Sequence, residues 1–170
     1  MLQSLGADTF EIRNIEDWQQ QKDGLVIPGG ESTTMTKLLN DLQLMEPIRE
    51  AIKGGLPVFG TCAGLIELAK LEHGEPTNRV STMDIEVYRN AYGRQLGSFQ
   101  TTASFKGIEK EVSMTFIRAP FINKVYGSAE VLAIVDGHIV AARQEKQLVT
   151  AFHPELGDDT AVHQYFIDMI

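Results

Sequence analysis

Short apolar runs alternate with amphipathic stretches through the first half of the chain. Residues 24–28 form an apolar run followed by two glycines, which predicts a buried strand entering a tight loop. The next stretch predicts a helix with Ser32 as its N-cap, because apolar side chains recur at i, i+3, i+4 and i+7 from Met35. Residues 56–60 predict another buried strand, and 65–71 another helix. Strands that alternate with helices indicate parallel strands joined by crossovers.

The second half of the chain is richer in strand-forming residues. The segments with alternating or β-rich character are 82–88, 97–104, 111–118, 130–135, 138–142 and 148–152. Asp136-Gly137 lies between two of them and is a strong hairpin signal. An amphipathic helix closes the chain. We therefore expect an α/β sandwich with a mainly parallel sheet and an antiparallel extension.

The first residues do not fit the usual start of such a sheet. Open α/β sheets normally begin with a strand, but Met1–Ala7 resembles the end of a helix capped by Gly6. From usual element lengths we expect that the first strand and half of its helix, about twenty residues, are missing. The chain is then a single domain, 1–170, shortened at its N-terminus.

Composition limits the classes of partner. The net charge is −8, from 15 basic and 23 acidic residues, which argues against nucleic-acid binding. No apolar run is long enough to cross a bilayer, and no secretory signal opens the chain. Cys62 is the only cysteine, so an internal disulfide is impossible and a reducing cytoplasm is expected. Small molecules or other proteins are the expected partners.

Cys62 stands between a predicted strand and a predicted helix, flanked by Gly60 and Gly64. A nucleophile on such a sharp turn projects clear of the sheet, as in the G-x-S-x-G elbow. The helix start would stabilise a thiolate and would present the Ala63 amide to an oxyanion. The alternative is a buried structural cysteine. The flanking glycines favour the nucleophile.

His153-Pro154-Glu155 follows the last predicted strand. Side chains at i and i+2 of an extended segment point to the same side, so Glu155 can orient the His153 ring toward Cys62. A Cys-His-Glu triad assembled from two strand ends fits this arrangement. We expect the other three histidines, His73, His138 and His163, to be solvent-exposed and without a catalytic role.

Three further segments offer groups that suit an amino-acid substrate. The Gly30 amide, in the loop 28–32, is a candidate second oxyanion donor, although a simple turn into a helix also explains this loop. Arg89 and Arg118 end apolar strands, where an arginine can bind a substrate carboxylate. Isolated arginines are more often solvated.

Five segments in order resemble the triad-type, or class I, glutamine amidotransferases, and more closely the glutaminase subunits of pyridoxal 5′-phosphate synthases. They are PGGEST (28–33), FGTCAGLI (59–66), RNAYGRQLGSF (89–99), FIRAP (116–120) and FHPEL (152–156). The glycine-rich loops and the HPE ending are shared across triad amidotransferases. The GGEST, GRQ and FIRAP segments indicate the narrower group.

The resemblance implies a flavodoxin-like three-layer sandwich that hydrolyses L-glutamine to L-glutamate and ammonia through a γ-glutamyl thioester. The implied triad is Cys62, His153 and Glu155, with no metal or organic cofactor. The implied glutamine contacts are Gly30, Glu31, Ser32, Arg89, Ile117 and Arg118. The ammonia would pass to a (β/α)-barrel synthase subunit that makes pyridoxal 5′-phosphate.

Other classes of function remain open from sequence. The chain could be a triad amidotransferase subunit of another pathway, which differs only in the synthase that it serves. It could also be a non-catalytic binding subunit or a redox-sensing elbow-cysteine protein. A redox sensor needs an oxidisable cysteine but no His-x-Glu at the facing strand end.

Overall fold

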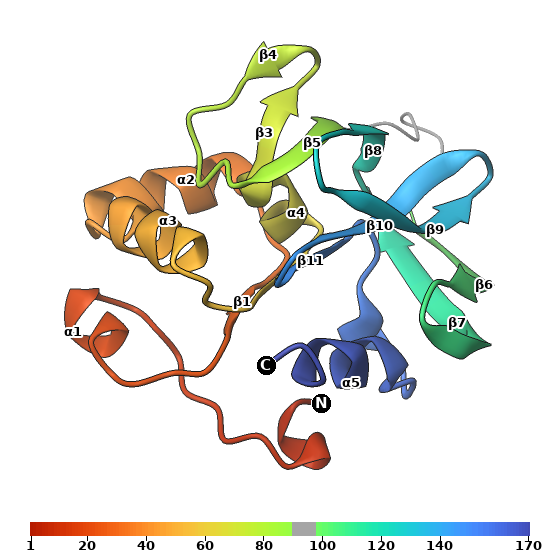
Figure 1. Ribbon diagram of the computed structural model, residues 1–170, viewed down its shortest axis with the longest axis horizontal. Helices are drawn as coiled ribbons and strands as arrows, with labels where there is room; N and C mark the ends of the chain where they lie inside the picture. The colour runs from red at the N-terminus through yellow and green to blue at the C-terminus, as the bar shows by residue number, and fades with distance from the viewer. Residues whose placement is uncertain (90–97) are drawn as a thin grey trace.

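The computed structural model of this chain describes residues 1–89 and 98–170 and shows a mixed α/β fold (Figure 1). The α-helices are α1 (Ile15–Trp18), α2 (Ser32–Asp41), α3 (Met45–Lys53), α4 (Ala63–Leu68) and α5 (Ala161–Ile167). Short 3-10 turns occupy Gln3–Leu5 and Pro154–Leu156. The strands are β1 (Leu25–Ile27), β2 (Val58–Thr61), β3 (Ala69–Glu72), β4 (Glu75–Pro76), β5 (Met83–Tyr88), β6 (Ser98–Phe105), β7 (Ile108–Ile117), β8 (Phe121–Val125), β9 (Glu130–Val135), β10 (His138–Gln144) and β11 (Gln147–Thr150).

The main sheet has the order β1-β2-β11-β10-β8-β5-β3-β4, with β9 also paired to β10. Strands β1, β2 and β11 are parallel neighbours, and β3 is parallel to β5. The pairs of β10 with β11, β8 and β9 are antiparallel, and β6 and β7 form a separate hairpin. The α/β class and the antiparallel extension expected from sequence are confirmed.

Helices lie on both faces of the parallel part of the sheet (Figure 1). The Phe59 ring in β2 packs on Phe166 and His163 of α5, with centroids 5.5 and 5.7 Å apart. A Cβ on the next residue, Gly60, would point to the other face and meet the carbonyl oxygen of Gly64 in α4 at 2.6 Å. Successive residues of β2 therefore face different helix layers, as strand geometry requires.

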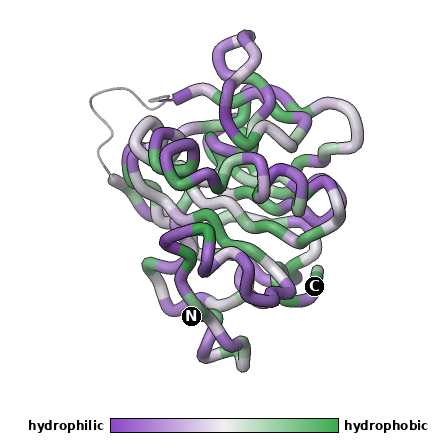
Figure 2. The backbone as a smooth tube through the Cα atoms, turned by 90° about the vertical axis from the view of Figure 1, so that its left-hand side faces the viewer, coloured by the Kyte–Doolittle hydropathy of each residue, from purple (hydrophilic) through white to green (hydrophobic). Residues whose placement is uncertain are grey.

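The buried core follows the strands of the central sheet. Figure 2 shows hydrophobic segments along the interior strands, whereas the β3–β4 hairpin is largely hydrophilic. Val58, Phe59, Leu148 and Val149 are fully buried, which explains why β2 and β11 have continuous apolar sequences. No helix in the described part of the chain is long and apolar enough to span a bilayer.

Several element boundaries differ from the sequence prediction. The helix expected over 65–71 ends at Leu68, because Ala69 is extended and begins β3, which pairs with β5. Strands β3, β4 and β8 were not expected. The Asp136-Gly137 turn is confirmed, with φ of 50° and 79° at the two residues, as a tight hairpin turn requires.

The predicted N-cap of α2 is wrong by one residue. Glu31 is the N-cap, and its carboxylate accepts hydrogen bonds from the Thr33 amide at 3.1 Å and the Thr34 amide at 2.7 Å. The hydroxyl groups of Thr33 and Thr34 also donate to this carboxylate. The longer glutamate side chain thus satisfies the first amides of α2, and Ser32 is instead buried in the helix.

Candidate active site

Cys62 lies at the junction between β2 and α4. Its φ of 49° and ψ of −100° lie outside the regions that L-residues normally adopt, which is characteristic of strain at a functional turn. The Cys62 amide donates to the Thr150 carbonyl at 2.8 Å, so this turn is anchored to β11. Ala63 is the first residue of α4, and such an amide has no partner within its own helix.

The glycines around Cys62 allow β1, β2 and α4 to approach closely. A Cβ at Gly64 would lie 2.0 Å from the Ile27 carbonyl oxygen. A Cβ at Gly60 would lie 2.6 Å from the Gly64 carbonyl oxygen. Both clashes involve backbone atoms, which cannot move aside as a flexible side chain can. The sequence argument that small residues are needed beside Cys62 therefore has a direct steric basis.

His153 follows β11, the parallel neighbour of β2, so the two side chains meet at the carboxyl ends of adjacent strands. His153 Nδ1 lies 2.6 Å from Glu155 Oε1, and the His153 side chain also hydrogen-bonds Cys62. The bond to Cys62, followed by that to Glu155, raises the pKa of His153 to about 10. Because Glu155 engages Nδ1, Nε2 is the nitrogen available to Cys62. The three predicted residues are thus adjacent, with His153 between the other two.

Two contacts fix the position of His153. Its amide donates to the Thr115 carbonyl of β7 at 2.8 Å. A Cβ at Gly29 would lie 2.4 Å from Cε1 of the His153 ring, so the backbone of the 28–32 loop packs directly against the imidazole. The sequence indicated this loop as an oxyanion donor, a glutamine contact or a simple turn into a helix. The contact between Gly29 and His153 was not predicted.

Glu155 remains ionised beside His153. Burial raises the pKa of Glu155, but the hydrogen bond and the charge of His153 act in the opposite direction, and the pKa is lowered overall. The His153–Glu155 pair is therefore an imidazolium next to a carboxylate at neutral pH. This arrangement places a proton donor beside Cys62.

The structure brings some of the predicted substrate contacts together. Arg89 Nη1 lies 3.5 Å from Ser32 Oγ, which joins the end of β5 to the start of α2. Gly30 has a φ of 153°, a conformation that L side chains rarely adopt. The Glu31 carboxylate is committed to capping α2, and its hydrogen bonds, first that from the Thr33 hydroxyl, lower its pKa to about 2. Residues 90–97 of the predicted GRQ segment lie outside the described residues.

Arg118 and Ile117 lie at the end of β7. Arg118 has a φ of 44°, which is unusual for a residue other than glycine. Its side chain has no hydrogen bond or ion pair with any residue that the structure describes. Ile117 is 39% exposed. A strained, unpaired arginine at a strand end is suited to bind an anionic group.

This chain matches the SNO glutamine amidotransferase family over residues 1–170.

The chain belongs to this family.

Named relatives agree with the family assignment. A pyridoxal 5′-phosphate synthase subunit PdxT from Methanocorpusculum labreanum is 60% identical, covering 100% of this chain and 89% of the relative. A subunit of the same name from Streptococcus pneumoniae (strain CGSP14) is 56% identical, and the match covers 99% of this chain and 88% of that relative. A crystal structure of a glutamine amidotransferase aligns with a TM-score of 0.91 at 38% identity, covering 99% of this chain and 89% of that one. The resemblance inferred from the sequence motifs is confirmed.

The other histidines of this amidotransferase differ from one another. His73 is exposed, as expected. His138 is half-buried against Phe121, with ring centroids 4.5 Å apart. His163 is buried at 6% exposure, and burial lowers its pKa, so its expected solvent exposure is wrong. The side of α5 that carries His163 packs against the Phe59 ring of β2, which buries this histidine.

No group of three or more His, Cys, Asp or Glu side chains within residues 1–89 and 98–170 is arranged to hold a metal ion.

Proposed function

We propose that this glutamine amidotransferase hydrolyses L-glutamine with Cys62 as nucleophile, His153 as acid and base, and Glu155 as the partner of His153. The observation that carries the proposal is the position of the His153 ring between Cys62 and Glu155, with Nδ1 2.6 Å from Glu155 Oε1. The raised pKa of His153, about 10, supports a protonated ring in the resting enzyme. A thiolate beside an imidazolium is the reactive form of such a pair.

The reaction begins when the Cys62 thiolate attacks the side-chain carbonyl carbon of glutamine. The amides of Gly30 and Ala63 are the proposed donors to the resulting oxyanion. His153 gives its proton to the departing nitrogen, and the C–N bond breaks. Ammonia departs, and a γ-glutamyl thioester remains on Cys62. His153 is then neutral and takes a proton from the attacking water. Collapse of the second intermediate releases glutamate and restores the thiolate and the imidazolium.

The substrate must be held by its α-amino and α-carboxyl groups, because these distinguish glutamine from other amides. Arg89 and Arg118 are the proposed cations for the carboxylate, in a site bordered by Gly30, Ser32 and Ile117. Glu31 is proposed to shape this border through its cap on α2, since its carboxylate is already bonded to Thr33 and Thr34. The acidic net charge of −8 makes such local cations the main attraction for an anionic group.

The ammonia is proposed to pass to a (β/α)-barrel synthase subunit that makes pyridoxal 5′-phosphate. The names of relatives at 60% and 56% identity, which extend over nearly the whole chain, support this acceptor. Direct transfer is physically favourable because released ammonia would be protonated and diluted. The single free cysteine supports a site of action in the reducing cytoplasm.

Cys62→Ala tests the proposal. Glutamate formation from glutamine, measured with a pyridoxal 5′-phosphate synthase barrel subunit present, should fall by at least about a thousandfold, as loss of other triad nucleophiles does. A glutamine-derived alkylating analogue should label Cys62 in the parent and leave the variant unlabelled. Circular dichroism and co-elution with the barrel subunit serve as controls for folding and docking. Substantial glutamate formation by the correctly folded variant would disprove the assignment.

A further inference from the structure

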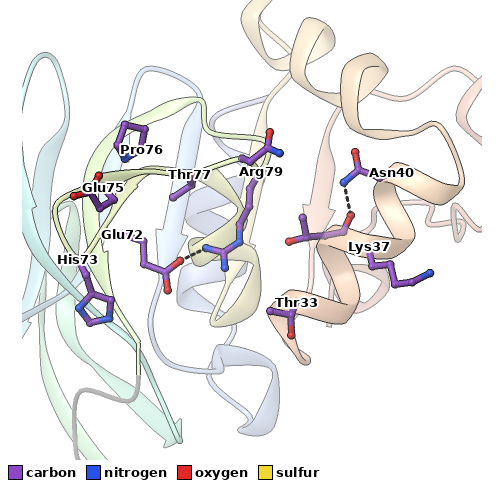
Figure 3. Close-up of a pocket in the computed structure, with 11 residues that line it drawn as sticks. Thr33, Lys37, Asn40, Glu72, His73, Glu75, Pro76, Thr77 and Arg79 are labelled. Atoms are coloured by element: carbon purple, nitrogen blue, oxygen red, sulfur yellow. Dashed lines mark hydrogen bonds and ion pairs between the residues drawn. The ribbon is translucent and has the colours of Figure 1, made fainter.

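A chain of alternating charges leads away from Arg89 into the protein. The Glu72 carboxylate at the end of β3 accepts a hydrogen bond from Arg89 Nε through Oε1. Its other oxygen, Oε2, accepts from Arg79 Nη1 at 2.6 Å (Figure 3). Both oxygens of Glu72 are therefore engaged by guanidinium groups. Sequence reasoning missed Glu72, because a glutamate beside a polar turn is usually solvated.

Arg79 is itself held firmly. Its side chain is 9% exposed, and its Nε lies 3.8 Å from the buried carboxyl group of Glu67 in α4. Arg49 of α3 donates to the carbonyl oxygens of Arg79 and, at 3.0 Å, of Val80. The backbone and the side chain of Arg79 are thus fixed by two different helices. Glu72 is attached to the rigid part of the fold through Arg79.

The Glu72–Arg89 contact leaves one edge of the Arg89 guanidinium available. Glu72 binds Nε, whereas Nη1 points toward Ser32 Oγ at 3.5 Å. The Arg89 side chain is 36% exposed, compared with 15% for Glu72. A guanidinium that is held through Nε can still present both terminal nitrogens to a carboxylate in the paired geometry that arginine favours.

We propose that Glu72 is a positioning residue that orients Arg89 to receive the α-carboxylate of glutamine. The inference rests on the proposed function of Arg89. Glu72 does not contact the substrate; it restricts the rotamers of a long side chain that would otherwise lose this freedom on binding. Glu72 also lines, with Arg79 and Thr33, an open groove of about 570 Å³, so no packed side chain would replace its hold on Arg89.

Glu72→Gln is the primary test. A glutamine amide has only one oxygen, so it can accept from Arg89 or from Arg79, and its amino group faces a donor in either case. Assayed with the barrel subunit present, the variant should have a KM for glutamine raised by about tenfold, as expected for a lost hydrogen bond between charged groups, and a kcat within twofold of the parent. Glu75→Gln is the matched control, since it removes the same charge from the same hairpin at an exposed residue.

A structural defect is distinguished from lost positioning by two measurements. Alkylation of Cys62 by iodoacetamide, which has no carboxylate, should proceed at the parental rate in Glu72→Gln. Hydrolysis of 4-aminobutanamide, which is glutamine without its α-carboxylate, should be equally slow in the parent and in the variant. If Glu72→Gln does not fold, Glu72→Asp, which keeps the charge but is one methylene shorter, should raise KM by a smaller factor.

Arg89→Ala separates the two proposals. If this change leaves KM for glutamine unaltered, the role of Arg89 in the proposed function is wrong. If Arg89→Ala raises KM but both Glu72 variants match the Glu75→Gln control, the positioning role is wrong and that of Arg89 stands. If both proposals are correct, the double variant Glu72→Gln with Arg89→Ala should have the same KM as Arg89→Ala alone, because Glu72 acts only through Arg89.

Discussion

His153 has two partners, and their separate contributions to its protonation can be measured. Cys62 is the larger cause of the raised pKa of about 10, and Glu155 is the second. Glu155→Gln removes a negative charge that stabilises the imidazolium, so we predict a lower His153 pKa and a kcat reduced by about a hundredfold or more. Cys62→Ala should lower the pKa further than Glu155→Gln.

The measurement is an NMR titration of the His153 ring, with the signal identified by its loss in a His153→Gln variant. The direction in which each substitution changes the pKa of His153 follows from the partner that is removed. Both partners raise the pKa, so each removal must shift the titration midpoint to lower pH. A midpoint unchanged by Glu155→Gln would show that the 2.6 Å contact does not stabilise the imidazolium.

Site residues that are marked by their neighbours in the sequence could be predicted from the sequence. Residues whose surroundings are set by contacts with distant parts of the chain could not. Cys62 was found through its flanking glycines, and Glu155 through its spacing from His153. Glu72 depends on Arg89, seventeen positions later in the chain, and no local pattern indicates that contact. His163 was misjudged because its burial is decided by Phe59, which approaches from the sheet.

Helices α2 and α4 are joined by a buried contact between Thr36 and Glu67. The Thr36 hydroxyl lies 2.9 Å from the Ser32 carbonyl oxygen and 2.5 Å from Glu67 Oε1. A hydroxyl has one proton and cannot donate to both oxygens. We predict that Glu67 is protonated and donates to Thr36, which then donates to Ser32. Burial is the largest influence on the pKa of Glu67 and raises it, whereas a hydrogen bond from Thr36 and the charge of Arg79 at 3.8 Å act in the opposite direction.

Glu67→Gln tests this link between the helices. A raised pKa means that the folded state holds the proton more tightly than the unfolded state. The stabilisation is therefore present at low pH and is lost as the pH rises above the ordinary glutamate value of about 4.3. An amide is neutral at every pH, so the stability of Glu67→Gln relative to the parent should increase with pH, by at most about 1.4 kcal/mol per pH unit.

Denaturant unfolding from pH 4 to pH 8 measures this difference. Glu109→Gln, at an exposed residue, is the control and should differ little from the parent throughout. A difference between Glu67→Gln and the parent that stays constant with pH would show that Glu67 is not protonated in the fold.

Element boundaries were less predictable than the elements themselves. The apolar pattern of 65–71 continues beyond α4 because β3 is also buried at its start, and helix and strand cannot be separated by hydrophobicity alone there. The Glu31 cap was missed because short polar residues are the usual N-caps. Parallel pairing of β1 and β2 was expected because strands alternate with helices in this half of the chain, and the structure adds β11 as a second parallel neighbour of β2.

At the scale of the whole molecule, a glutaminase that serves a synthase should pass its ammonia to that synthase without releasing it into solvent. The proposed triad lies at the carboxyl ends of β2 and β11, on an edge of the sheet where a second protein can cover it. Pyridoxal 5′-phosphate contains a single nitrogen, so the source of that atom can be traced. We predict that glutamine labelled with ¹⁵N in its side-chain amide transfers this label to the product even in a large excess of unlabelled ammonium.

The experiment uses this chain, the barrel subunit, and the pentose phosphate and triose phosphate that the family resemblance implies as its other substrates. The product is analysed by mass spectrometry. Glutamine turnover should also be faster with the barrel subunit than without it, because the resemblance to this group of glutaminases implies that docking activates the site. Cys62→Ala supplies the control, since its product should carry only the nitrogen of the added ammonium. If the label in the product is diluted to the level of the bulk ammonium, ammonia is released into solvent before it is used. If glutamine turnover is equal with and without the barrel subunit, docking does not activate the proposed triad.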